Sequence, residues 1–97
     1  MEKKVFVVNI GEENSRKMEK VWYEYNASRD IIAFLMQQEG VKFENLQEYI
    51  NVAEVRFVEC EKMKERLAAE FKPEEVDLTK YNYGFDFEQF TITFTEA

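Results

Sequence analysis

The sequence predicts an α+β fold, in which a long antiparallel helical hairpin is joined to a small antiparallel sheet in the order β-α-α-β-β. Two long stretches, 16–38 and 46–71, place apolar residues at helical spacing. The segments 4–10 and 81–97 are instead rich in β-branched and aromatic residues, and those of the second segment alternate with polar ones. The chain has 97 residues and no internal repeat, so residues 1–97 are expected to form a single domain.

The first element is a strand over residues 4–10, KVFVVNI, which ends before Gly11. Successive side chains of a strand point to opposite faces. Phe6, Val8 and Ile10 should therefore face the core, and Val5 and Val7 should lie on the other side.

The first helix is expected to start within residues 12–15 and to stop at Gly40, and its stretch Arg16 to Gln38 has two apolar faces. A helix that is apolar on two sides is typical of a central layer. We therefore expect three layers in the order sheet, first helix, second helix. One face comprises Met18, Val21, Trp22, Tyr25, Ile32 and Met36, and the other comprises Tyr23, Ala27, Ile31 and Phe34.

The second helix should run to about Phe71, because Pro73 cannot continue it. The turn over residues 41–45 is short, so the two helices must be antiparallel. The expected inner stripe of this helix consists of Leu46, Ile50, Ala53, Phe57, Cys60, Leu67 and Phe71.

The apolar positions of the C-terminal segment change parity. Tyr81, Tyr83, Phe85 and Phe87 are odd-numbered, whereas Phe90, Ile92 and Phe94 are even-numbered. A continuous strand cannot exchange its faces without a turn or a bulge. We predict a hairpin that turns near residues 88–89, with a bulged single strand as the alternative.

Catalytic and metal chemistry is sparse in this sequence. There is no histidine, which excludes His-based triads and His metal sites, and there is no Gly-rich phosphate loop. Cys60 is the only cysteine, and a buried apolar role is preferred over a nucleophilic one because its helix face offers no basic partner. We therefore predict a protein that is not an enzyme and has no catalytic residues, cofactor or bound metal.

The net charge of −7 arises entirely from residues 43–97, which contain thirteen acidic and six basic residues. This balance disfavours direct binding to nucleic acids or anionic membranes. The acidic surface either serves solubility or occupies a basic site on another protein. The absence of a disulfide pair, of a signal sequence and of a 20-residue apolar span predicts a cytoplasmic protein.

Three valines of the second helix, Val52, Val55 and Val58, lie off its inner stripe. β-branched residues are mediocre helix formers, so local helix propensity does not explain them. One explanation is that the connector over residues 73–80 covers them with Val76 and Leu78. The other is a protein-docking patch with Tyr49 and Arg56 at its margin.

A second candidate surface is the C-terminal strand. Thr91, Thr93 and Thr95 alternate with apolar residues and would form the polar face of a sheet covered on one side only. As an edge strand, it would present free N–H and C=O groups to another chain or to a second copy. The simpler interpretation is a half-buried strand without a binding role.

The order of elements and the terminal segment YNYGFDFEQFTITF resemble small Firmicutes proteins. Some of these accompany CXXX-repeat peptide modification clusters, and others belong to prophages or mobile elements. Trp22 is the only tryptophan here, whereas the modification-cluster proteins have a pair. The resemblance implies a small bacterial accessory protein and assigns no role to any residue.

Together these features predict a non-catalytic protein–protein interaction module, acting as an accessory or adaptor in a bacterial or phage system. Its partner would be another protein, with a homodimer also open. The alternative is an acidic anti-defence inhibitor that occupies a nucleic-acid-binding site on a basic partner.

Overall fold

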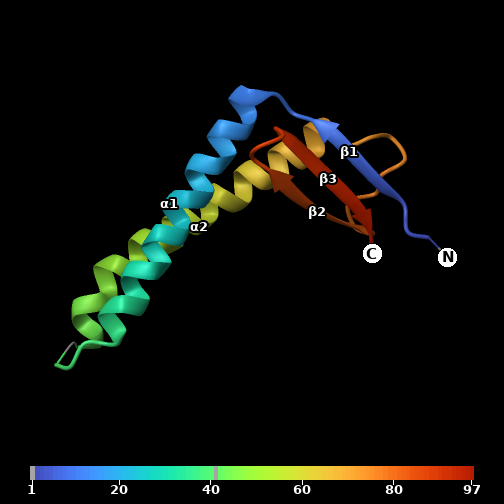
Figure 1. The fold of residues 1–97 in the computed structure, drawn as a ribbon. Coiled ribbons are helices and arrows are strands. Elements are labelled where there is room, and N and C mark those ends of the chain that lie inside the picture. The colour runs from blue at the N-terminus through green and yellow to red at the C-terminus, as the bar shows by residue number, and fades with distance from the viewer. Residues whose placement is uncertain (1, 41) are drawn as a thin grey trace.

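The computed structural model describes residues 2–40 and 42–97, apart from the side chains of residues 43 and 45. It contains two helices and a three-stranded antiparallel sheet, so the predicted α+β class and element order are confirmed (Figure 1). The elements are β1 (Val5–Asn9), α1 (Glu12–Met36), α2 (Phe43–Phe71), β2 (Tyr81–Asp86) and β3 (Thr91–Glu96).

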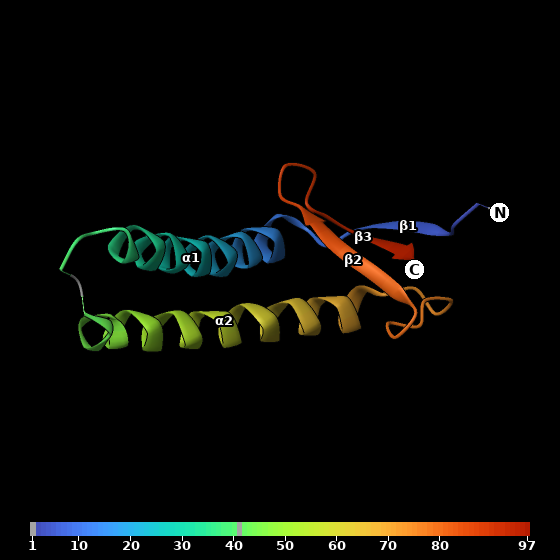
Figure 2. The same cartoon turned by 90° about the horizontal axis from the view of Figure 1, so that it is seen from below.

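The two helices lie side by side and antiparallel, as expected from the short turn between them (Figures 1 and 2). α1 begins at Glu12, within the predicted start over residues 12–15 and directly after Gly11, which adopts a φ of 85° that favours glycine. This start places Glu12 and Glu13 in the first turn, where negative charge is favourable. α2 ends at Phe71, two residues before Pro73, as predicted.

The sheet has the order β1-β3-β2, and β3 is its central strand. Ile92 lies opposite Val8 on one side and Phe85 on the other. Phe94 lies in the same way between Phe6 and Tyr83. The even-numbered residues of β1 and β3 therefore share the inner face with the odd-numbered residues of β2, as their alternation predicts.

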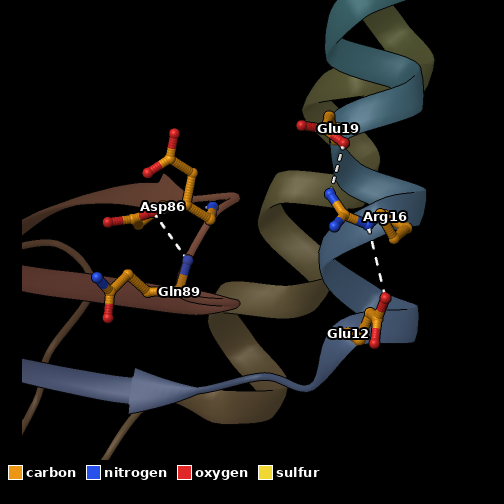
Figure 3. Close-up of polar contacts among 6 residues, drawn as sticks. Glu12, Arg16, Glu19, Asp86 and Gln89 are labelled. Carbon is orange, nitrogen blue, oxygen red and sulfur yellow. Dashed lines mark hydrogen bonds and ion pairs between the residues drawn. The ribbon is translucent and has the colours of Figure 1, made fainter.

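A turn over residues 87–90 joins β2 and β3, so the predicted hairpin is confirmed and the bulged strand is wrong. Asp86 organises this turn, because its Oδ1 accepts a hydrogen bond from the N–H group of Glu88 at 3.0 Å. It accepts a second one from the N–H group of Gln89 at 3.1 Å (Figure 3). Phe90 completes the turn with a φ of 58°. The N–H of Ile10 donates to the carbonyl of Phe90 at 2.8 Å, which fixes the turn beside the start of α1.

The hydrophobic core lies where the inner face of the sheet meets the last turns of α2 and the first turns of α1. Val76 of the connector completes it, and Leu78 packs against its margin. Figure 2 shows the sheet at one end of the hairpin, with both helices continuing well beyond it. The buried cluster consists of Ile10, Met18, Cys60, Leu67, Ala68, Val76, Ile92 and Phe94.

The expected three-layer arrangement is wrong, because the sheet does not cover the second apolar face of α1. Ile31 is 47% exposed and Phe34 is 63% exposed. The chain between β1 and α1 is only two residues long, so the sheet is held at the start of α1. Ile31 lies about 28 Å further along that helix at 1.5 Å per residue, whereas a strand of this length spans only about 20 Å. We call residues 22–36 and 46–58 the distal half of the hairpin.

Candidate functional site

The valines that folding alone did not explain are at the surface. Val52 is 50% exposed, Val55 is 58% exposed and Val58 is nearly half exposed. The connector does not cover them, since Val76 and Leu78 pack on the core at the opposite end of α2. The explanation by burial under the connector is therefore wrong. We refer to Tyr49, Val52, Val55, Arg56 and Val58 as the valine patch.

The two sides of the hairpin differ, because the sheet lies on only one of them. On one side, the rings of Trp22 and Phe87 of the β2–β3 turn lie 5.9 Å apart. On the other side, Arg56 of α2 forms an ion pair with Glu24 of α1. Successive residues of a helix are 100° apart, so Val52 lies on the same side as Arg56, away from the sheet.

The structure splits the predicted patch. Tyr49, Val52 and Arg56 lie together on the side away from the sheet, and Val55 lies at the outer margin of that side. Val58 instead points toward the sheet side and lines a groove there. Val52 thus lies on the side away from the sheet, whereas Val58 borders the sheet-side groove and also shares a shallow depression with Val55 on the outer face of α2.

The groove on the sheet side was not predicted as a site. It has a volume of about 570 Å³ and lies between the two helices in the distal half. The rings of Tyr25 and Phe57 form its wall at a centroid distance of 5.4 Å, and the guanidinium of Arg29 lies over the Tyr25 ring at 5.7 Å. The residue that could have indicated this groove is Phe57. The sequence places it on the inner stripe of the second helix, but its side chain is nearly half exposed. Its lining comprises Tyr25, Arg29, Ile50, Ala53, Glu54, Phe57 and Val58.

The predicted edge strand is wrong. Thr91, Thr93 and Thr95 belong to β3, which is hydrogen-bonded to β1 on one side and to β2 on the other. β3 therefore has no free backbone edge that could recruit another strand. The three threonines do form part of a polar outer face, because Ile92 and Phe94 between them are buried.

Two ionisable groups in or beside the core have shifted pKa values. Cys60 is buried, and its desolvation raises the pKa of the thiol, which disfavours the nucleophilic thiolate. Desolvation likewise raises the pKa of Tyr83 on the inner face of the sheet. Within residues 2–40 and 42–97, no group of three or more acidic or cysteine side chains is arranged to hold a metal ion.

Neither helix is apolar over a long enough stretch to cross a membrane, as far as the described residues show. Comparison of the chain with protein-family models, with curated proteins and with solved structures gave no match.

Proposed function

We propose that this protein is a non-catalytic interaction module that binds another protein through the distal half of its helical hairpin. The observation that carries the proposal is the exposed valine patch in the distal half, outside the buried core cluster. Isolated exposed hydrophobic residues are normal on a monomer, but contiguous apolar surface of this kind is typical of binding sites.

The distribution of side chains supports this assignment. The distal half holds tyrosine, valine, isoleucine and phenylalanine side chains that are about half exposed or more. Aromatic residues and arginine are enriched in protein interfaces, and the patch contains Tyr49 and Arg56. The resemblance to small bacterial and phage proteins agrees with a role as an accessory or adaptor protein.

The test is affinity capture from the native host with three immobilised proteins. Val55→Glu places a charge in the patch and should abolish capture of the partner that the wild-type chain retains. Val7→Glu is the matched control, because Val7 is 63% exposed on the outer face of the sheet and should retain the partner. Circular dichroism should show that all three proteins are folded. Equal capture by wild type and a folded Val55→Glu variant would exclude the patch.

The second candidate function is an acidic inhibitor of a nucleic-acid-binding protein. It is favoured by the concentration of the whole net charge of −7 in residues 43–97. Ionic strength separates the two functions, because the Debye length falls from about 10 Å at 0.1 M salt to about 3 Å at 1 M. A complex held by the valine patch should survive the high-salt wash, whereas a complex held by charge mimicry should be lost.

A further inference from the structure

We propose that a second copy of this chain binds the valine patch, so that two α2 helices pack antiparallel about Val52 and the two hairpins form a four-helix bundle. This inference rests on the proposed function and names the occupant of the same surface. It is carried by the internal symmetry of the side chains on α2, by the shape of the hairpin and by the area that is available.

The residues on the outer side of α2 are chemically symmetric about Val52. Three positions before and after it stand the apolar residues Tyr49 and Val55. Four positions before and after it stand the opposite charges Glu48 and Arg56. A two-fold interface brings the same patch of both subunits together, so residue i of one copy meets residue j of the other and the reverse. An axis at Val52 would therefore pair Tyr49 with Val55 and Glu48 with Arg56 in both directions.

The surface around Val52 carries charges of both signs, so a second copy can pair Glu48 with Arg56 across the axis. A patch with charges of one sign would repel its own copy, whereas this one presents both a carboxylate and a guanidinium. Arg56 already forms an ion pair with Glu24, and 39% of its side chain remains exposed. Arg56 also lies 3.9 Å from Glu59, and because guanidinium carries five N–H donors it can keep both of these carboxylates and accommodate Glu48 of the second copy.

The shape of the hairpin also fits. Two antiparallel helices form one half of a four-helix bundle, and their uncovered face needs the other half. The turn of the sheet, with Phe87 against Trp22, stands on the opposite side of the hairpin. A second hairpin can therefore lie along the valine side without meeting the sheet. On α1, Ile31 and Leu35 turn toward this same side, at the helical positions that follow Glu24 by seven and eleven.

The available area is sufficient for a weak dimer. Ile31, Tyr49, Val52 and Val55 are each about half exposed, and at about 150 Å² for a free large side chain they offer about 300 Å² of apolar surface. Interfaces are about 60% apolar, so each copy would bury about 500 Å². The total of about 1,000 Å² is at the lower limit for a specific interface. We therefore expect a dissociation constant in the micromolar range.

The first experiment is analytical ultracentrifugation of the purified chain, from about 1 µM to about 500 µM, a range that brackets a micromolar dissociation constant. The wild-type chain should change from monomer to dimer. Val52→Glu should remain monomeric, because the axis would place its two carboxylates against each other. Val7→Glu should dimerise like the wild type. A wild-type monomer at every concentration, or a dimer that persists in a folded Val52→Glu variant, would overturn the proposal.

A second variant locates the axis and does not depend on how Val52→Glu folds. Val52→Cys should form an intermolecular disulfide on mild oxidation, since the two Val52 positions face each other at the axis. The wild-type chain, whose Cys60 is buried, and Val7→Cys should remain uncrosslinked. A Val52→Cys protein that does not crosslink, or that crosslinks no faster than Val7→Cys, would overturn the antiparallel arrangement.

The two proposals can fail separately. A purified chain that stays monomeric but captures a host protein through Val55 would leave the proposed function standing and remove the second copy. A Val52-centred dimer that captures no host protein would support the second copy and remove the adaptor role.

Discussion

Arg56 on α2 donates to a carboxylate oxygen of Glu24 on α1, and among the described residues this is the ion pair that joins the two helices. The other ion pairs join residues three or four positions apart on one helix. Arg56 also lies 3.9 Å from Glu59 on its own helix. The pair links the two helices within the distal half, where fewer side chains are buried than near the sheet.

A double-mutant cycle measures this contact. Glu24→Ala, Arg56→Ala and the double variant should give a coupling energy of about 0.5–1 kcal/mol in urea denaturation, because both side chains are only partly exposed. The same cycle on Glu13 and Lys17, a highly exposed pair on α1, should give a smaller value. Equal coupling in the two cycles would show that the Glu24–Arg56 pair is no stronger than an exposed pair within one helix.

Two phenylalanines should respond in opposite ways to removal of their rings. Phe94 is fully buried in the centre of the sheet, so Phe94→Ala should cost about 3–5 kcal/mol and leave little stable protein. Phe34 lies on the uncovered side of α1, and Phe34→Ala should change the free energy of unfolding by no more than about 0.5 kcal/mol. Urea denaturation at low protein concentration measures both. A large loss for Phe34→Ala would show that the monomer covers this face after all.

The sequence was sufficient to predict the helices and strands but not to predict how they pack together. The periods of 3.6 and 2 identified both helices and all three strands, and the change of parity between Phe87 and Phe90 located the hairpin. Periodicity reveals how many faces of a helix are apolar but not what covers each face. The apolar face at Ile31 and Phe34 was therefore assigned to a sheet that does not reach it.

The order of the strands in the sheet could not be predicted for a related reason. Alternation in TITFT is the same for a central and an edge strand, so the threonines alone did not decide the position of β3. The neighbouring strand contained the useful signal, because Asn82, Gly84 and Asp86 are residues that weaken a central strand and suit an edge. The turn residue was missed as well, since Asp86 supplies through its side chain what glycine or asparagine usually supplies through the backbone.

The valine patch was the part of the candidate site that sequence reasoning could reach. Helix propensity and the position of the inner stripe were enough to mark Val52, Val55 and Val58 as unexplained by local folding. Which of them share a surface could not be predicted, because this depends on where the sheet lies. Val58 borders the groove on the sheet side of the hairpin, whereas Val52 lies on the other side. That placement depends on the short β1–α1 connection and on packing against α2, neither of which is visible in periodicity.

Ser15 offers a stabilising substitution. Its side chain is 1% exposed at the start of α1, and its Oγ has no hydrogen-bond partner within the described part of the chain. A buried hydroxyl without a partner costs about 1–3 kcal/mol, and alanine is the better helix former. Ser15→Ala should therefore raise the free energy of unfolding by about 1 kcal/mol, with a melting temperature about 4–8 °C higher. A lower melting temperature would show that the hydroxyl has an unrecognised partner.

Cys60 should make the stability of the protein depend on pH in the alkaline range. Burial raises the pKa of its thiol above the ordinary value of 9.0, so the folded chain binds this proton more tightly than the unfolded chain. The resulting stabilisation is complete below pH 9.0 and is lost as the pH rises through the folded-state pKa. The melting temperature should therefore decline above pH 9.0. Tyr83, with a pKa raised above 10.0 by burial, should add a second decline at higher pH.

Cys60→Ala separates the two contributions. The variant should be less stable than the wild type at neutral pH because it loses a buried sulfur, but its melting temperature should change little between pH 9.0 and 10.0. The decline above pH 10.0 should persist, because Tyr83 is unchanged. If the slope of melting temperature against pH between these values were the same in both proteins, the Cys60 thiol would not be desolvated in the folded chain, and the core around it would have to be open to water.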